Sequence, residues 1–399
     1  MRTRKTLSLL TVGVLPALLL AACGSETATT PESAGSETAT TTTAAGDCEA
    51  AMGALIAGGG AGAVAGGDSA GGMPGLPEGV DPSDLPEGID PGDLPAGGDA
   101  ATTEGGVQGI VPQTEATGDV QAASYTDVAY ADVSDAQVFD LYLPAGVEEA
   151  PLVVAIHGGG FMMGDKAMET SHVQTLLDAG FAVATVNYRL SCESTYPAAV
   201  QDVKAAVRYL RANADTYDID ADKIAAWGES AGGYLADMLG ATSGQESEFD
   251  DPSLGNADVS SDVQAVVSWY GITDFATMDE QFAASTPATC TTVQEHDAAD
   301  SPESVFLGGA LPEITETTTS ASVFTYLESS TTLPPFSLAA GDSDCNVPNQ
   351  QSSTLADAVN AAGGSATFTL LEGATHGDDL FNTELTDDEV AFLQEALAA

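Results

Sequence analysis

Short apolar runs bounded by turn residues recur along the last two thirds of this 399-residue chain. Their β-branched and apolar content predicts eight strands, at 125–130, 137–143, 152–156, 181–186, 224–228, 264–269, 336–340 and 366–371. Between them, apolar positions at helical spacing predict helices, at 167–179, 197–213, 231–240, 349–362 and 386–397. Two early strands followed by alternating strand and helix predict an α/β fold, with a mostly parallel eight-stranded sheet covered by helices on both faces.

Two of these helices have recognisable starts. Pro197 stands at the first turn of the helix at 197–213, where the missing N–H of proline costs no hydrogen bond. Thr386 is the expected N-cap of the last helix, because three carboxylates follow it at the positive end of the helix dipole.

The first 120 residues have a different composition. Residues 24–45 are nearly all Ser, Thr, Ala, Gly, Glu and Pro, and 58–72 are rich in Gly and Ala. A Leu-Pro-Glu-Gly repeat begins at Leu76 and returns nine residues later. A calcium-binding β-roll also repeats every nine residues, but it does not carry proline at this density. We therefore predict a disordered tether over 23–120 and one folded α/β domain over 121–399.

The N-terminus has the pattern of an export signal. Three basic residues precede an apolar run at 7–22 that is too short to span a membrane, which predicts a signal peptide over 1–22. The run ends in Leu-Ala-Ala-Cys and so resembles the bacterial lipobox. The resemblance implies that Cys23 becomes the lipidated first residue, anchored to the extracellular face of the bacterial cell membrane. An ordinary secretory signal followed by a chance cysteine is the alternative.

The charge of the chain excludes some partners. It has 9 Lys and Arg against 60 Asp and Glu, a formal net charge of −51. Such a surface repels nucleic acid and anionic headgroups, so we expect no nucleic-acid partner and membrane contact only through the lipid anchor. Outside the signal, every basic residue lies between Lys166 and Lys223.

A serine motif stands between a predicted strand and a predicted helix. Residues 228–232 read G-x-S-x-G with Ser230 at the centre, which is the context of a nucleophile elbow. A serine on so sharp a turn needs strained backbone angles, and side chains two residues away on either side would collide. Ser230 is therefore the candidate nucleophile.

A glycine-rich loop follows the strand at 152–156. It reads His157-Gly158-Gly159-Gly160-Phe161, and three glycines allow its N–H groups to approach a substrate as oxyanion donors. A plain glycine turn is the alternative. A phosphate-binding loop is disfavoured, because neither G-K-[ST] nor G-x-G-x-x-G is present.

The base is expected after the nucleophile, since the chain order in this arrangement is Ser, acid, His. Of the four histidines, His157 and His172 precede Ser230. His296 lies among acidic residues and is interpreted as solvated surface. His376 follows the last predicted strand and is the candidate base. For the acid, the turn after the strand at 336–340 offers both Asp342 and Asp344, which the residues alone do not separate.

From about residue 130 to 381 the chain resembles the hormone-sensitive-lipase-like branch of the α/β-hydrolases, close to bacterial acetyl-xylan and feruloyl esterases. The matching motifs are His157–Gly160, Asn187–Leu190, Gly228–Gly233, Ser301–Ser304, Gly341–Pro348 and His376–Gly377. The resemblance implies Ser230 as nucleophile, His376 as base, Asp344 as acid, and the N–H groups of Gly159, Gly160 and Ala231 as the oxyanion hole.

The chain departs from that family at several positions. Phe161 replaces a common Trp, and Asp378 and Asp379 follow the base where an apolar residue is usual. The segment 275–332 is rich in Thr, Ser and acids and is predicted to form a small cap over the pocket.

The cysteine count suggests two disulfides. Five cysteines are an odd number for an exported protein, and lipidation of Cys23 would leave four. A zinc site is disfavoured because no two cysteines have C-x-x-C spacing. A bridge from Cys290 to Cys345 would pin the cap to the acid loop, which leaves Cys48 and Cys192 to pair with each other.

The sequence thus predicts a serine carboxylic-ester hydrolase that acts on small-acyl, carbohydrate or phenolic esters and needs no metal or organic cofactor. A polysaccharide ester or a small-molecule ester would be its substrate, and the motifs leave the alcohol part and the oligomeric state open. A peptidase of the prolyl-oligopeptidase type is one alternative, but residues 24–120 cannot build its β-propeller. A non-catalytic surface-binding protein on the same fold is the other.

Overall fold

The computed structural model describes residues 120–398. The predicted signal peptide, Cys23, Cys48 and all but the last residue of the predicted tether lie outside the described residues. No helix within 120–398 is both long and apolar enough to cross a membrane.

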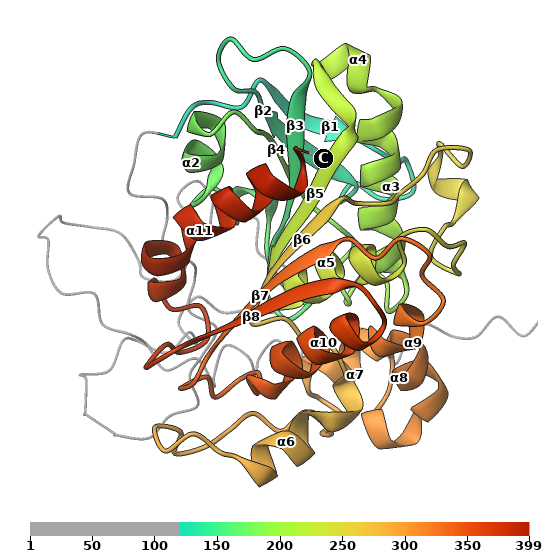
Figure 1. Ribbon diagram of the computed structural model, residues 1–399. Helices are drawn as coiled ribbons and strands as arrows, with labels where there is room; N and C mark the ends of the chain where they lie inside the picture. Colours follow the sequence, from blue (N-terminus) through green and yellow to red (C-terminus); the bar gives the residue numbers. More distant parts are fainter. Residues whose placement is uncertain (1–119, 399) are drawn as a thin grey trace, which may run out of the picture. The chain divides into compact units, whose positions relative to one another are not determined.

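Eight strands form one sheet in the order β1-β2-β4-β3-β5-β6-β7-β8 (Figure 1). They are β1 (Tyr125–Ala129), β2 (Val138–Tyr142), β3 (Ala150–Ile156), β4 (Ala182–Val186), β5 (Ile219–Glu229), β6 (Ala265–Trp269), β7 (Pro335–Gly341) and β8 (Ser365–Leu371). The pairs β1–β2 and β2–β4 are antiparallel, and every other neighbouring pair is parallel. The predicted fold class and all eight predicted strands are confirmed.

Helices cover both faces of this sheet. The main ones are α2 (Val173–Asp178), α3 (Ala198–Ala212), α4 (Ala214–Tyr217), α5 (Ala231–Ala241), α10 (Gln350–Ala361) and α11 (Leu380–Ala396). Side chains of α3, α5 and α10 pack in one buried cluster, and those of α2 and α11 pack in a second. The two clusters lie on opposite faces, because successive residues of one strand alternate between them.

The central strands illustrate this alternation. In β3, Val154 and Ile156 belong to the first cluster, whereas Val153 and Ala155 belong to the second. A strand buried on both faces has no polar side, so its sequence is a continuous apolar run rather than an alternating one. This is why β3 and β5 were recognisable from composition alone.

The last helix begins earlier than the sequence predicted. It starts at Leu380 rather than Thr386, so the predicted cap was wrong. The Oδ1 atom of Asp378 accepts the N–H of Leu380 at 3.0 Å, which satisfies one N–H that would otherwise be free at the helix start. Buried Phe381 and Leu385 then extend the apolar face toward the N-terminus. Asp378 therefore stabilises the start of α11 from the position before its N-cap, Asp379.

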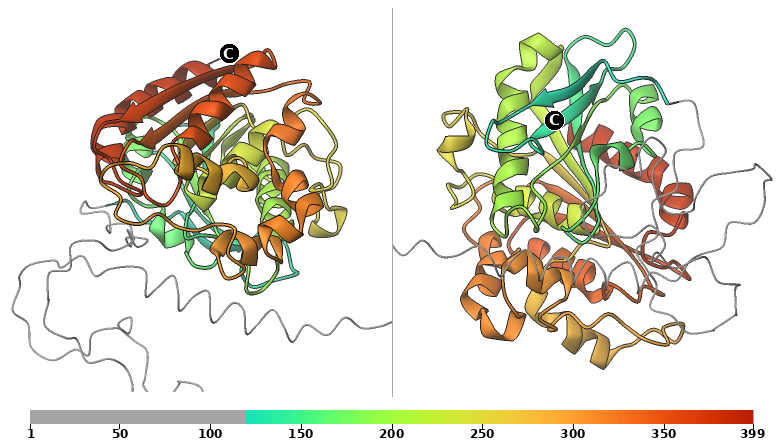
Figure 2. Two further views of the ribbon diagram at one scale, coloured as in Figure 1. Left: turned by 90° about the horizontal axis from the view of Figure 1, so that it is seen from below. Right: turned by 180° about the vertical axis from the view of Figure 1, so that it is seen from behind.

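The segment between β6 and β7 includes residues 275–332, for which the sequence predicted a cap. It carries four short helices, α6 (Met278–Ala284), α7 (Pro302–Leu307), α8 (Thr315–Ala321) and α9 (Phe324–Leu327). Figure 1 and the right view of Figure 2 place these golden and orange helices together at the end of the domain opposite to α4. His296 lies in this segment and is 0% exposed, so its interpretation as solvated surface was wrong. The acidic residues beside His296 in the sequence suggested an exposed segment, although its own side chain is buried.

The disulfide between Cys290 and Cys345 is confirmed, with the two Cα atoms 5.6 Å apart. Cys192 is also disulfide-bonded. Its predicted partner, Cys48, lies outside the described residues.

A buried ion pair holds α3 against the first half of the sheet. Asp202 is 0% exposed and accepts hydrogen bonds from Arg189 Nη2 at 2.7 Å and from Arg189 Nε at 2.9 Å. Gln137 Nε2 donates to the same carboxylate at 2.7 Å. One carboxylate on α3 thus fixes the residues that follow β4 and those that precede β2.

We expect Asp202→Asn to lower the free energy of unfolding by about 3 kcal/mol, because it leaves the partly buried Arg189 guanidinium without its counter-charge. Asp220→Asn is the matched control: its partner Lys223 lies 3.9 Å away at a partly exposed position. That change should cost less than about 1 kcal/mol. Urea denaturation followed by circular dichroism measures both, and equal losses would contradict a structural role for the Asp202 pair.

Candidate active site

The carboxyl ends of four parallel strands meet at one edge of the sheet. Ile156 at the end of β3 pairs with Gly228 near the end of β5, and Gly341 at the end of β7 pairs with Leu371 at the end of β8. The loops that follow these strands carry the glycine motif, the serine, the acid and the base. The register therefore gathers residues that are far apart in the sequence.

Ser230 sits on a strained turn between β5 and α5. Its φ is 55° and its ψ is −119°, a conformation that few non-glycine residues adopt. A Cβ atom at Gly228 would collide with the carbonyl oxygen of Gly232, and one at Gly232 would collide with that of Ile156. Both glycines are thus required by the turn, as the sequence motif suggested.

A chain of hydrogen bonds connects Ser230, His376 and Asp344. The Nε2 atom of His376 lies 2.9 Å from Ser230 Oγ, and its Nδ1 atom lies 2.7 Å from Asp344 Oδ2. His376 is 8% exposed and Asp344 is 1% exposed. Because an ionised carboxylate can only accept, the hydrogen of the neutral imidazole belongs on Nδ1, and Nε2 can accept a proton from the serine hydroxyl.

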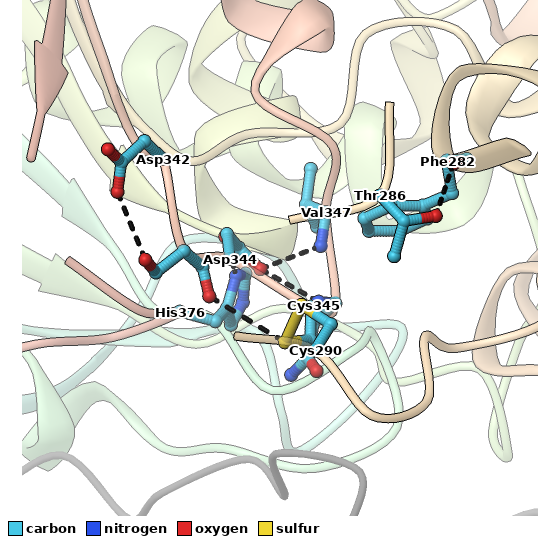
Figure 3. Close-up of a disulfide and its surroundings, with 10 residues drawn as sticks. Phe282, Thr286, Cys290, Asp342, Asp344, Cys345, Val347 and His376 are labelled. Carbon is cyan, nitrogen blue, oxygen red and sulfur yellow. Dashed lines mark hydrogen bonds and ion pairs between the residues drawn. A yellow bond between two sulfur atoms is a disulfide. The ribbon is translucent and has the colours of Figure 1, made fainter. Parts of the chain in front are cut away.

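The second oxygen of Asp344 is also satisfied. Asp344 Oδ1 accepts the backbone N–H groups of Asn346 at 2.8 Å and Val347 at 2.9 Å (Figure 3). These bonds orient the carboxylate so that Oδ2 faces His376. Asp344, the candidate acid, is thus held in this orientation by the backbone of its own loop.

Asp342, the other carboxylate of the turn, has a different set of partners. Its Oδ1 accepts the N–H of Gly373 at 2.7 Å and the hydroxyl of Ser343 at 3.0 Å, and its carboxylate points away from His376 (Figure 3). Asp342 therefore braces the turn after β8. Of the two carboxylates that the residues left open, the structure brings Asp344 to the base.

The glycine loop packs tightly against the serine. A Cβ atom at Gly158 would lie 2.9 Å from the carbonyl oxygen of Glu229. Gly159 and Gly160 have positive φ values of 109° and 60°. Within residues 120–398, no acceptor takes up the N–H of Gly159 or Gly160. Ala231 is the first residue of α5, where a helix leaves its N–H groups free. These three N–H groups are therefore available to an anionic oxygen.

His157 supports the glycine loop through a hydrogen bond and a ring contact. Its Nδ1 lies 2.7 Å from the carbonyl oxygen of Gly158, and its ring stacks on Tyr188 at 4.4 Å. Burial lowers the pKa of His157 to about 4, so the ring is neutral at physiological pH. His157 thus has a structural place beside the site, whereas His376 has the contact with the serine.

Sequence reasoning missed a buried group behind the base. Tyr270 directly follows β6, and its ring centroid lies 4.7 Å from that of His376. Its hydroxyl donates to Glu229, the residue before the serine. The other oxygen of Glu229 lies 3.0 Å from His172 Nε2. The position of Tyr270, first after a parallel strand, was the only available signal.

Comparison with known proteins agrees with this geometry. The BD-FAE family matches residues 139–359, which is more than half of the chain. Esterase LipQ of Mycobacterium tuberculosis is 28% identical over 268 residues, covering 66% of this chain and 59% of its own length. Esterase LipC of the same organism is 29% identical over 259 residues, covering 64% and 60%. The chain thus spans about three fifths of the length of these curated relatives.

Solved structures extend the comparison to the fold. A structure described as a truncated form of carbohydrate esterase from gut microbiota is 31% identical, with a TM-score of 0.62, covering 70% of this chain and 98% of that one. The esterase Est2 of Thermogutta terrifontis, in its butyrate-bound form, is 22% identical with a TM-score of 0.53, covering 69% and 93%. The latter likeness shows the fold alone. The chain belongs to the BD-FAE family, within the α/β-hydrolase esterases.

Proposed function

We propose that this protein is a serine carboxylic-ester hydrolase whose nucleophile, base and acid are Ser230, His376 and Asp344. The observation that carries the proposal is the unbroken hydrogen-bond chain from Ser230 Oγ through both nitrogens of His376 to Asp344 Oδ2. The same three residues, in the same order of roles, make up the serine-hydrolase triad. A binding protein would gain nothing from a strained serine held in this way.

The reaction would proceed through an acyl-enzyme. Ser230 Oγ attacks the ester carbonyl while its proton passes to His376 Nε2, and Asp344 compensates the imidazolium that forms. The carbonyl oxygen becomes an oxyanion, held by the N–H groups of Gly159, Gly160 and Ala231. His376 then protonates the leaving alcohol. Water attacks the acyl group through the same base, which releases the acid and restores Ser230.

For the substrate we infer small-acyl, carbohydrate or phenolic esters. Two findings support this class: the BD-FAE match and the 31% identity to a structure described as a carbohydrate esterase. A peptidase is the rival enzyme. Hydrolysis of p-nitrophenyl and sugar acetates, with no hydrolysis of peptide anilides, is the expected result of a direct comparison.

Ser230→Ala, His376→Ala and Asp344→Asn should each lower kcat by about three orders of magnitude or more, because the three side chains act as one unit. Asp342→Asn is the matched control, since its carboxylate bonds to the β8 turn rather than to His376. It should retain most of the wild-type kcat. The measurement is kcat and KM with p-nitrophenyl acetate, together with covalent labelling of Ser230 by a fluorophosphonate.

The outcome that contradicts this assignment is specific. If Asp342→Asn lowers kcat strongly while Asp344→Asn lowers it only slightly, the acid is Asp342 and not Asp344. A Ser230→Ala variant that hydrolyses esters at the wild-type rate would remove the serine mechanism altogether.

The second part of the proposal concerns location. We infer that residues 1–22 direct export and that Cys23 carries the lipid, because the apolar run ends in Leu-Ala-Ala-Cys. In this reading the catalytic domain acts at the extracellular face of the cell membrane, on a tether of about one hundred residues.

Cys23→Ser should release the protein from membranes and abolish its labelling with radioactive palmitate, because the thiol is the site of acylation. Cys48→Ser is the control and should keep both properties. Cell fractionation, lipid labelling and mass spectrometry of the mature N-terminus provide the measurements. A mature N-terminus at any residue other than Cys23 would contradict lipidation at this cysteine.

A further inference from the structure

Three attachments join one stretch of the cap segment to the loop of the acid. The Cys290–Cys345 disulfide is the first (Figure 3). The backbone N–H of Gln294 donates to the carbonyl oxygen of Cys345 at 3.2 Å. His296 Nε2 lies 2.9 Å from the carbonyl oxygen of Asn346. Residues 290–296 therefore run alongside residues 345–346, and His296 makes the contact that lies nearest to the bonds of Asp344.

The hydrogen-bond partners of His296 determine its protonation state. Its Nδ1 lies 2.8 Å from Asp279 Oδ1, and its Nε2 faces the Asn346 carbonyl. Both partners are acceptors, since Asp279 also accepts the backbone N–H groups of His296 and Asp297. A neutral imidazole has one N–H and would leave one of these pairs with two facing lone pairs. Only the imidazolium satisfies both bonds.

The surrounding charges favour the same state. Asp279 on α6 and Glu303 on α7 face the ring, with Glu303 Oε1 4.0 Å from Nε2. Asp297 adds a third carboxylate on the same segment. The sequence has no Lys or Arg after Lys223, so no permanent cation of this half of the chain opposes them.

The two pKa directions agree with this arrangement. Burial alone would lower the pKa of His296, but the charge of Glu303 and the bonds to Asp279 and Asn346 outweigh it and raise that pKa above its ordinary value. Burial likewise would raise the pKa of Asp279. The hydrogen bonds from the ring and backbone of His296 and from the backbone of Asp297 lower it instead, to about 2.

One peptide group links His296 to the catalytic acid. The carbonyl of Asn346 and the N–H of Val347 belong to the same planar peptide unit. Its oxygen accepts the bond from His296, while its N–H donates to Asp344 Oδ1 at 2.9 Å. A charged donor at the oxygen polarises the peptide and strengthens the bond that its N–H makes on the other side.

We propose that the His296 imidazolium is a positioning residue for Asp344: it holds and polarises the peptide between Asn346 and Val347, and so keeps the carboxylate directed at His376. This proposal rests on the ester-hydrolase function proposed above. His296 itself touches neither substrate nor the serine.

The proposal implies a loss of activity on the alkaline side. A folded-state pKa above the unfolded value of about 6.5 means that the contribution of His296 is complete below that pH. It is lost as pH rises through the folded-state pKa, because the neutral ring can donate only one of its two bonds. Above that pH the Asn346–Val347 peptide is no longer held by a charged donor, and kcat should fall.

The test is kcat and KM against pH, from 6 to 10, with a neutral ester. The wild type should show an alkaline limb. His296→Gln should lower kcat at pH 7 by about 10- to 100-fold, as expected when a catalytic group is misplaced from a distance, with a smaller change in KM and no alkaline limb. Glu303→Gln and Asp279→Asn should move the limb to lower pH, because each removes a charge that favours the imidazolium.

Glu280→Gln is the matched control, since it removes an exposed carboxylate from the same helix as Asp279. It should leave the limb at its wild-type pH. If His296→Gln fails to fold, the limb shifts in Glu303→Gln and Asp279→Asn still decide the question. An unchanged kcat in His296→Gln, or a limb that does not move in either acidic variant, would overturn the proposal.

A second readout does not depend on turnover. Histidine labelled with ¹³C and ¹⁵N gives four ring systems, and His296→Gln identifies the one of interest. In an inactive Ser230→Ala background, the His296 ring should carry two protons at pH 7. A neutral ring at that pH would overturn the proposal. Ester hydrolysis absent from the wild type, beside a doubly protonated His296, would overturn the proposed function instead.

Discussion

The tight approach of the first turn of α5 to the carboxyl end of β3 is the constraint on which the site depends. Gly232 lies so close to the carbonyl oxygen of Ile156 that no side chain fits between them. This contact allows Ser230 to stand on a turn with positive φ and places its hydroxyl beside the glycine loop that follows β3. If Gly232 and Ile156 lay farther apart, the turn at Ser230 would not need its strained backbone angles. The N–H groups of the glycine loop would then also lie farther from the Ser230 hydroxyl. The position of Ser230 is therefore set by backbone packing before any polar side chain contributes.

The polar side chains then form a series of contacts that leads outward from Ser230. Ser230 contacts His376, His376 contacts Asp344, and the backbone of residues 346–347 holds Asp344. Behind the base, Tyr270 supports the ring and passes its hydroxyl bond to Glu229. His376, Asp344 and Tyr270 are all buried. Few alternative rotamers therefore compete with the arrangement in which His376 faces Ser230.

The sequence was informative where one short stretch determines the local structure. The central strands of the sheet contain continuous apolar runs, and the elbow and glycine loop are contiguous motifs, so both could be predicted. It was uninformative where the partner lies far along the chain. Thr386 resembled a cap because Phe381 and Leu385 gave no sign of joining the same buried face. His296 resembled surface because its partners, Asp279, Glu303 and Asn346, are 7 to 50 residues away. The choice of Asp344 over Asp342 came from family resemblance, since two carboxylates in one turn differ only in what they reach.

The disulfide and its two neighbouring bonds also make a mechanical link. Residues 290–296 and the loop of Asp344 are fastened together, so an outward movement of that part of the cap pulls on the loop that carries the acid. A displacement of residues 290–296 would therefore reach the carboxylate of Asp344 through one covalent bond and a short series of hydrogen bonds, and not through side-chain packing alone.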